Sequence, residues 1–359
     1  MKTQGVPDRL QRMLTMKKSK FLLLGLLAIL AVTILPSSVY AEGGAGFTME
    51  AAIPDNQVGT STYFDLHVKP DTKQNLTIKF TNLEDKAIKL NVSPNPAFTN
   101  RNGVIEYSQY KYPKDDSAKY TIPELFSKPQ DITLKAKEVK DVTFTMTTPK
   151  QAFDGMILGG FYALRDDENK TQSSGNIQID NRYALVLGVA LREDLKKTIE
   201  PELKLNAIKP GLDNSRTAVF ANLQNIKPQA FGEMTVDAKV YQKGSDKVYK
   251  ATKKDKQEMA PNSNYDFAID WKNQPIEAGD YHLSLVATSG KKEWKFEQDF
   301  TIADKGLQKI NEEAVGLPEK NYLWLYILIA VLLLLILVIL AFILGRKKRK
   351  EDEDDTKTE

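Results

Sequence analysis

Cysteine is absent from the 359-residue chain, and histidine occurs only twice. The protein therefore has no disulfide, no thiol nucleophile and no cysteine-ligated metal. The motifs H-E-x-x-H, G-x-x-x-x-G-K-[ST] and G-x-S-x-G are also missing. Both His67 and His282 fall on the polar side of an alternating strand pattern, which predicts solvated strand residues. We expect no cofactor and no metal, whereas a glycosidase-type carboxylate pair stays open because such pairs meet only in space.

A long uncharged stretch near the C-terminus, Tyr322–Leu344, organises the rest of the chain. It contains no proline, and a helix of this length spans roughly 30–35 Å, enough to cross a bilayer. A buried core helix would be shorter and polar on one face. Aromatic residues suited to lipid headgroups begin the stretch and basic residues follow it, namely Tyr322, Trp324 and Tyr326, then Arg346, Lys347, Lys348 and Arg349. We therefore predict a single-pass type I membrane protein with residues 345–359 as a cytoplasmic tail.

The first 41 residues are predicted to be a signal peptide. A basic segment ending at Lys20 precedes the apolar run Phe21–Leu35, and small residues occupy the −3 and −1 positions of a cut before Glu42. Translation starts either at the first methionine or at Met16. A retained membrane helix is the alternative, for which fifteen apolar residues are few.

The segment between the two apolar stretches, residues 42–321, is close to neutral. It holds 38 Lys and Arg against 40 Asp and Glu, so it lacks the basic excess of a nucleic-acid-binding protein. A segment of about 280 residues suggests two domains. An extracellular segment of this size without cysteine is more typical of a Gram-positive bacterium than of an animal.

Apolar and polar residues alternate with period two along this segment, for example at Leu76–Phe80 and Val142–Met146. Such alternation predicts half-buried antiparallel strands, and many short strands suggest an all-β protein of two sandwiches. We place the domains at 42–168 and 177–310, joined by a polar linker or hairpin loop at 169–176. Residues 311–321 form a juxtamembrane segment. Asp166–Asn169 is either a solvated loop or a calcium site, although the EF-hand spacing is absent.

The juxtamembrane residues Leu317–Asn321 come close to a sortase signal, L-P-x-T-G, but differ from it. Lys320 and Asn321 stand where the signal has threonine and glycine. Because the sortase cuts after the threonine, we predict a permanent membrane anchor and not a wall-linked product.

Four tyrosines crowd one polar stretch, YSQYKYPKDDSAKY. Sugars present apolar C–H faces that pack on aromatic rings, and the tyrosine hydroxyl adds a hydrogen bond. These residues, Tyr107, Tyr110, Tyr112 and Tyr120, are therefore our candidate glycan-binding surface. The alternative is that the rings pack on the sandwich with only their hydroxyls exposed.

Several segments together resemble a known family. In the first half they are Asn75–Asn82 (NLTIKFTN) and Gly155–Tyr162 (GMILGGFY). In the second half they are Pro201–Leu205 (PELKL), Ala260–Phe267 (APNSNYDF) and Trp294–Ile302 (WKFEQDFTI). Their order is similar to that in the WxL-interacting proteins of low-GC Gram-positive bacteria.

The resemblance implies two immunoglobulin-like domains in tandem. The first would be associated with peptidoglycan and the second with host or extracellular-matrix ligands. It also implies partnership with secreted WxL-domain surface proteins, and it supplies no catalytic residues. We therefore expect a membrane-anchored adhesion or scaffold protein, not an enzyme. A wall-active or polysaccharide-active enzyme is the alternative.

Overall fold

The computed structural model describes residues 44–166, 182–318 and 322–355. The predicted signal peptide and the predicted linker or loop at 169–176 lie outside the described residues. By its contacts the chain divides into two units, residues 1–47 and 48–359. The sheets described below belong to the second unit, apart from the first residue of β1.

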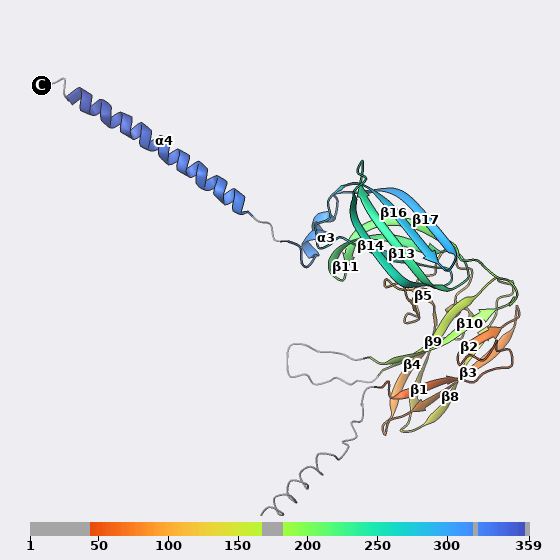
Figure 1. Ribbon diagram of the computed structural model, residues 1–359. Helices are drawn as coiled ribbons and strands as arrows, with labels where there is room; N and C mark the ends of the chain where they lie inside the picture. Colours follow the sequence, from red (N-terminus) through yellow and green to blue (C-terminus); the bar gives the residue numbers. More distant parts are fainter. Residues whose placement is uncertain (1–43, 167–181, 319–321, 356–359) are drawn as a thin grey trace, which may run out of the picture. The chain divides into compact units, whose positions relative to one another are not determined.

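The N-terminal half contains two sheets, drawn mainly in orange to green in Figure 1. The smaller sheet has the order β1 (Phe47–Ala51), β3 (Lys73–Asn82), β8 (Val139–Thr147), and the larger one the order β2 (Phe64–His67), β10 (Ala184–Arg192), β9 (Ile157–Arg165), β4 (Ile88–Pro96), β7 (Gln130–Leu134). The alternation seen in the sequence places one face of each strand inside. The rings of Phe144 on β8 and Phe161 on β9 lie 4.8 Å apart, so the two sheets pack face to face.

The sheet to which strand β10 belongs differs from the one expected from the predicted domain boundary. We placed residues 184–192 in the second domain, but β10 pairs antiparallel with β9 and parallel with β2. Leu187, Val189 and Leu191 on β10 are buried. Their apolar run suits a strand at the centre of a sheet. The N-terminal sheet pair therefore extends to Arg192.

The C-terminal half also contains two sheets. The first has the order β11 (Leu203–Asp213), β12 (Arg216–Asn225), β15 (Ser263–Asp270), and the second the order β14 (Val248–Met259), β13 (Phe231–Gln242), β16 (Gly279–Ser289), β17 (Lys292–Ile302). Leu223, Phe267, Val236 and Leu285, from both sheets, lie in one core with Trp271, which is fully buried. The short helix α3 (Leu307–Glu313) adds Leu307 to this core.

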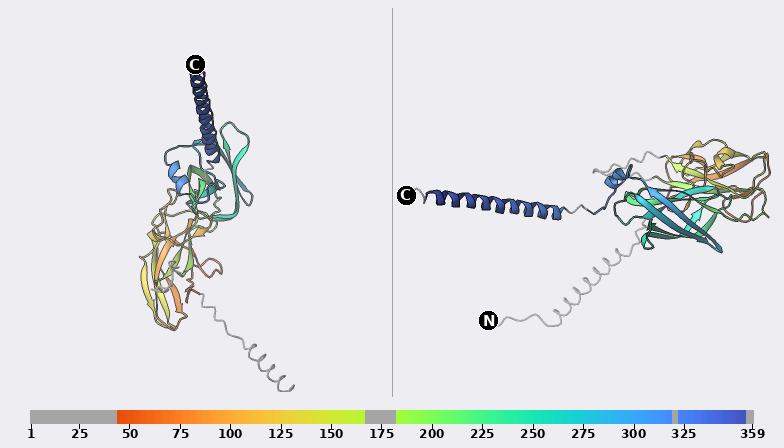
Figure 2. Two further views of the ribbon diagram at one scale, coloured as in Figure 1. Left: turned by 90° about the vertical axis from the view of Figure 1, so that its left-hand side faces the viewer. Right: turned by 90° about the horizontal axis from the view of Figure 1, so that it is seen from above.

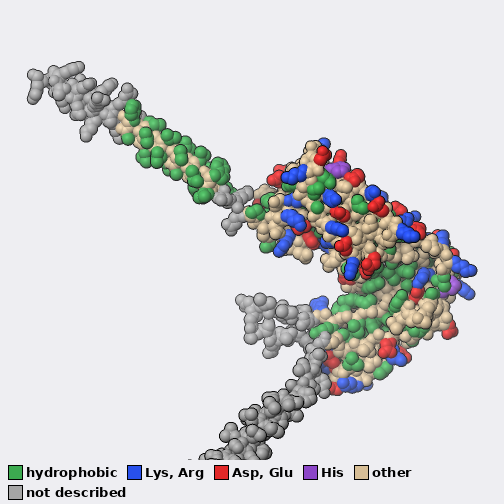
Figure 3. Space-filling view, viewed as in Figure 1, with side chains coloured by type: hydrophobic (Ala, Val, Ile, Leu, Met, Phe, Trp, Pro, Cys, Tyr) green, Lys and Arg blue, Asp and Glu red, His purple; other side chains and the backbone are tan. Residues whose placement is uncertain are grey.

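The apolar stretch near the C-terminus forms helix α4 (Leu323–Asp355), a single uninterrupted helix in Figures 1 and 2. Within the described residues it is the one helix long and apolar enough to cross a membrane, with a mean hydropathy of 3.4 over Leu323–Phe342. Hydrophobic side chains cover this part on the face seen in Figure 3. The helix continues beyond the predicted end of the span at Leu344, because the Arg, Lys and Glu residues that follow are good helix formers. The prediction of an all-β protein with one C-terminal apolar helix is confirmed.

Candidate functional site

The tyrosine segment, residues 98–121, lies between the two sheet pairs. It leaves β4 through the short strands β5 (Phe98–Thr99) and β6 (Ile105–Glu106) and ends before helix α2 (Ile122–Leu125). Its contacts reach the C-terminal sheets. The hydroxyls of Thr99 and Ser263 are 2.8 Å apart, and the backbone N–H of Glu258 donates to the carbonyl of Gly103 at 2.6 Å. The segment thus belongs to the first half by sequence and contacts both halves.

The four predicted tyrosines of this segment are all half-buried, but they do not form one surface. Tyr112 stacks on Phe98, with ring centroids 4.0 Å apart and planes 12° from parallel. Tyr112 and Tyr120 line a cavity, whereas Tyr107 and Tyr110 are not among the residues that line it. Tyr107 instead packs beside Gly160 on β9, where an added Cβ would come within 3.5 Å of its ring.

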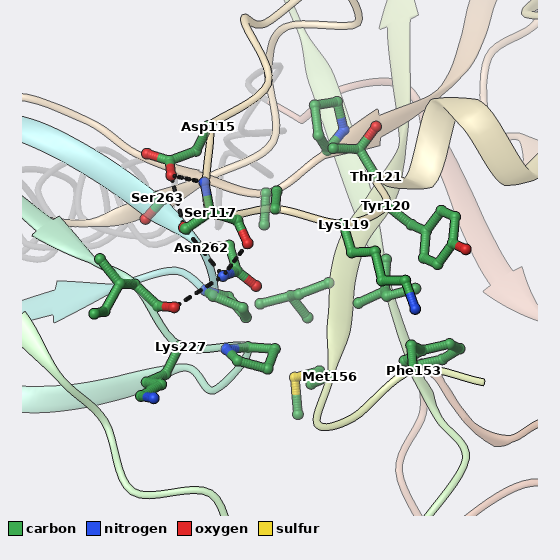
Figure 4. Close-up of a pocket in the computed structure, with 18 of the residues that line it drawn as sticks. Asp115, Ser117, Lys119, Tyr120, Thr121, Phe153, Met156, Lys227, Asn262 and Ser263 are labelled. Carbon is green, nitrogen blue, oxygen red and sulfur yellow. Dashed lines mark hydrogen bonds between the residues drawn. The ribbon is translucent and has the colours of Figure 1, made fainter. Parts of the chain in front are cut away.

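The cavity has a volume of about 650 Å³ and is lined by residues of both sheet pairs. In Figure 4, Lys119, Tyr120 and Phe153 lie on one side, and Asn262 and Ser117 on the other. The side-chain amide of Asn262 donates to the Ser117 carbonyl at 2.9 Å and lies 3.1 Å from its hydroxyl, so this wall is held by hydrogen bonds. Apolar residues fill much of the remaining lining, among them Phe98, Met156, Ile157, Ile199 and Pro228.

Charged groups of both signs also line the cavity. The Lys197 ammonium lies 2.7 Å from the Asp154 carboxylate, and the Lys114 ammonium 2.9 Å from that of Glu124, just outside the lining. The Lys119 ammonium donates to a carbonyl, that of Ala152, at 3.2 Å. The lining of the cavity therefore combines charged groups of both signs with apolar side chains.

A second surface, here called the tyrosine face, consists of Tyr63, Tyr107, Tyr162 and Val186 on the outer side of β9 and β10. Phe161 and Ala163 on β9 are buried, so Tyr162 between them points outward, directly opposite Val186. Next to them Gly160 and Gly188 are also paired, and these glycines leave room for the rings of Tyr107 and Tyr63. Figure 3 shows hydrophobic side chains gathered over the region of β9.

The tyrosine face is exposed but not freely solvated. Tyr63 and Val186 are 42% and 44% exposed, respectively. Burial raises the pKa of Tyr107, and the nearby Glu258 and Tyr63 raise it further. Burial likewise raises the pKa of Tyr162, with a smaller effect from Glu106. The hydroxyls therefore stay protonated at neutral pH and can donate hydrogen bonds.

Sequence reasoning found Tyr107 but missed its partners on the tyrosine face. The alternation in GMILGGFY places Tyr162 opposite to Phe161, and Tyr63 alternates with the buried Phe64. These signals give the side of each strand but not the neighbour across the sheet. The lysines that line the cavity carried no sequence signal, because exposed lysines are frequent.

The predicted membrane-interface residues lie on or beside helix α4. Tyr322, Trp324 and Tyr326 at its start are exposed, with 49–67% of their surface accessible. Arg346–Arg349 lie within the same helix. Within the described residues, no group of three or more His, Cys, Asp and Glu residues could hold a metal ion. Most of the candidate calcium segment Asp166–Asn169 lies outside the described residues.

The sequence matches two family models. Residues 47–165 match the peptidoglycan binding domain of the WxL Interacting Protein, and residues 174–312 match its host binding domain. The chain belongs to the WxL-interacting protein family. The family predicted from sequence resemblance is thus confirmed, and this WxL-interacting protein is a cell-surface binding protein with an apolar helix suited to a membrane anchor.

Other comparisons add little to the family match. The sequence comparison with curated proteins gives no match. Among solved structures, the E. coli chaperone DraB is 12% identical, with a TM-score of 0.26, covering 70% of this chain and 99% of that one. The Pseudomonas aeruginosa CupB2 chaperone is 11% identical, with a TM-score of 0.25, covering 64% of this chain and 93% of that one. Because these TM-scores are low, the fold is assigned from the sheets of this protein alone.

Proposed function

We propose that this protein is a type I membrane-anchored surface protein that binds peptidoglycan through its first domain. In this proposal two immunoglobulin-like domains stand in tandem outside the membrane after a signal peptide is removed. The second domain binds a host or matrix ligand, and secreted WxL-domain proteins are further partners. The family name supports the WxL partnership, and helix α4 supports the anchor.

The observation that carries the proposal is that the tyrosine face falls largely within the range matched by the peptidoglycan-binding model. Tyr63, Tyr107 and Tyr162 all lie in residues 47–165. Their rings offer flat apolar surface beside hydroxyl groups, which suits the C–H faces and hydroxyls of a sugar chain. Ser93 on β4, directly opposite Tyr162, is buried, so the tyrosine hydroxyls supply the accessible polar groups of this face. In this proposal the glycan strand lies across β9 and β10.

The test is sedimentation of the full-length protein in detergent with purified insoluble peptidoglycan. Tyr63→Ala combined with Tyr162→Ala should weaken binding about tenfold, since each ring contributes about 0.5–1.5 kcal/mol. Tyr241→Ala, on the C-terminal sheet β13, is the matched control and should bind as the wild type does. Failure of the wild type to sediment would overturn the proposed function. Unchanged binding by the double variant would mean that the glycan binds at another surface of the protein.

A second measurement on the same protein distinguishes a binding protein from a polysaccharide-active enzyme. We expect the protein to retain a WxL-domain protein in a pulldown and to release no reducing ends from peptidoglycan or polysaccharide. Time-dependent release of reducing ends by the wild type would favour a polysaccharide-active enzyme instead.

A further inference from the structure

We infer that the cavity between the two sheet pairs binds the peptide stem of peptidoglycan, a short peptide with small apolar side chains and charges of both signs. This inference rests on the proposed function and assigns a second part of the same polymer to a second site. In this arrangement the tyrosine face takes the sugars, and the cavity takes the peptide that branches from them.

The size of the cavity and the apolar part of its lining suit a short peptide. A volume of about 650 Å³ lies in the usual range for small-ligand sites, roughly 300–1,000 Å³. Met156, Ile199 and Pro228 give apolar surface against which methyl side chains can pack. The backbone N–H of Met156 also donates to the Pro228 carbonyl at 2.8 Å, so this wall joins the two halves.

Two lysines at the cavity fit a carboxylate ligand. Within the described residues, neither Lys119 nor Lys227 forms a salt bridge, unlike Lys197, which pairs with Asp154. Lys119 lies with its ammonium 5.5 Å from the ring centre of Tyr120, and Lys227 is exposed. Both lysines are exposed, and an ammonium group without a carboxylate in salt-bridge contact attracts an anionic ligand group.

A carboxylate behind the same wall fits the opposite charge. One oxygen of Glu193, Oε2, accepts a hydrogen bond from the backbone N–H of Phe153, a lining residue, at 3.1 Å. The other oxygen, Oε1, is buried and has no hydrogen-bond partner among the described residues. Glu193 is not itself a lining residue, so it contributes negative charge from behind the wall, beside the lining carboxylates Asp154 and Glu200. Burial raises the pKa of Glu193, and the nearby charge of Lys119 opposes that rise.

Both walls are held in place before any ligand arrives. Asp115 accepts hydrogen bonds from Gln224 and Asn264, and Ser117 is bonded to Asn262, so the tyrosine segment is fixed to the C-terminal sheets. A site held in this way loses little conformational entropy on binding. A site that is ordered before binding suits a protein that retains a ligand attached to a polymer.

The experiment uses full-length protein in detergent and a synthetic stem peptide, L-Ala-γ-D-Glu-L-Lys-D-Ala-D-Ala, in isothermal titration calorimetry. Lys119→Gln combined with Lys227→Gln should weaken peptide binding at least tenfold, and raising the salt concentration should weaken wild-type binding. The matched control, Lys128→Gln with Lys150→Gln, changes two exposed lysines outside the cavity and should bind normally. Thermal melting of each variant checks that the substitutions leave the fold intact.

The outcomes separate this inference from the proposed function. If the wild type sediments with whole peptidoglycan but does not bind the free peptide, the inference is overturned and the proposed function stands. Equal peptide binding by the cavity variant and the wild type would also overturn the inference. Conversely, the tyrosine-face variant should still bind the peptide, and it should lose binding to glycan strands from which an amidase has removed the stems.

Discussion

Asp115 and Gln224 are joined by a hydrogen bond across 109 residues of sequence, with Nε2 of Gln224 donating to Oδ1 of Asp115 at 2.7 Å. Asn264 on β15 donates to the other carboxylate oxygen at 2.5 Å. One side chain of the tyrosine segment thus links to two neighbouring strands of the C-terminal half. This contact helps to form the cavity wall.

Replacing Asp115 with Ala should loosen the tyrosine segment from the C-terminal sheets. Hydrogen bonds to a charged group contribute about 1.5–3 kcal/mol, so we expect the unfolding free energy to fall by about 1–3 kcal/mol. Hydrogen exchange should rise in β12 and β15. Asp116→Ala is the control, since Asp116 is exposed. Equal effects of the two substitutions would contradict the structural role of Asp115.

The same carboxylate predicts a response to acid. Burial would raise the pKa of Asp115, but hydrogen bonds from Ser117, Asn264 and Gln224 outweigh it and hold the pKa below its usual value of 3.8. A lowered pKa in the folded state stabilises the protein above the unfolded value, and this contribution is lost as the pH falls through the folded value. The stability difference between the wild type and Asp115→Ala should therefore shrink below about pH 4.

Gly155 is predicted to be intolerant of a side chain. It has φ = 73°, and an added Cβ would lie 2.3 Å from the Pro228 carbonyl oxygen. Gly155→Ala should cost about 1 kcal/mol for the left-handed backbone and a further 1–3 kcal/mol for the clash. Gly59 has a similar φ of 69° with no atom within 4 Å, so Gly59→Ala should show only the backbone cost. Chemical denaturation of both variants measures the difference, and equal losses would contradict the close approach.

Glu84 and Arg165 form a bidentate ion pair at the edge of the N-terminal sheet pair, with one N–O distance of 2.9 Å. Arg165 hydrogen bonds lower the pKa of Glu84 below its usual value of 4.5, against the effect of burial. The pair should stabilise the fold above that pH and lose its effect as the pH falls through the folded value. Glu84→Gln should cost about 1–2 kcal/mol, less than a fully buried pair because Glu84 keeps contact with solvent.

The control for the Glu84 substitution is its neighbour Asp85, whose side chain is 94% exposed although it lies 3.2 Å from Lys137. Asp85→Asn should change the unfolding free energy by less than about 0.5 kcal/mol. Urea denaturation at pH 7 and at pH 4 gives both comparisons. A Glu84→Gln loss that does not depend on pH would argue against the ion pair.

The contribution of His282 to folding stability should have the opposite pH dependence. Its two ring nitrogens lie 2.6 Å from the Asp299 carboxylate and 2.9 Å from that of Glu297, and these contacts raise the pKa of His282 above 6.5. A raised pKa stabilises the fold fully below the unfolded value and loses that effect as the pH rises through the folded value. His282→Gln should therefore reduce thermal stability at pH 6 more than at pH 9. His67→Gln serves as the control.

The proposed topology predicts the outcome of proteolysis on intact protoplasts. Protease added outside should remove the sheet domains and spare an epitope placed after Glu359, because the basic residues beyond the span favour the cytoplasmic side. Permeabilised protoplasts are the control, in which the epitope should disappear. Loss of the epitope from intact protoplasts would contradict the proposed orientation of the helix in the membrane.

The arrangement of the tyrosine face depends on contacts that local sequence patterns do not encode. Alternation places Tyr162 and Phe161 on opposite faces of one strand, since successive side chains point to opposite sides. It does not state that Tyr162 lies beside Val186, because strand register depends on partners distant in the chain. Of the four tyrosines chosen from one stretch, Tyr107 lies on the tyrosine face, Tyr112 and Tyr120 line the cavity, and Tyr110 belongs to neither.

The sequence by itself determined the all-β class, the apolar helix and the absence of cysteine chemistry. These follow from local periodicity, the length of one uncharged run and composition, which need no tertiary information. Only the tertiary structure decided that β10 completes the N-terminal sheet and that Asp115 meets Gln224 and Asn264. Those contacts are non-local, and their free energy comes from packing and hydrogen bonds between segments that the sequence keeps far apart.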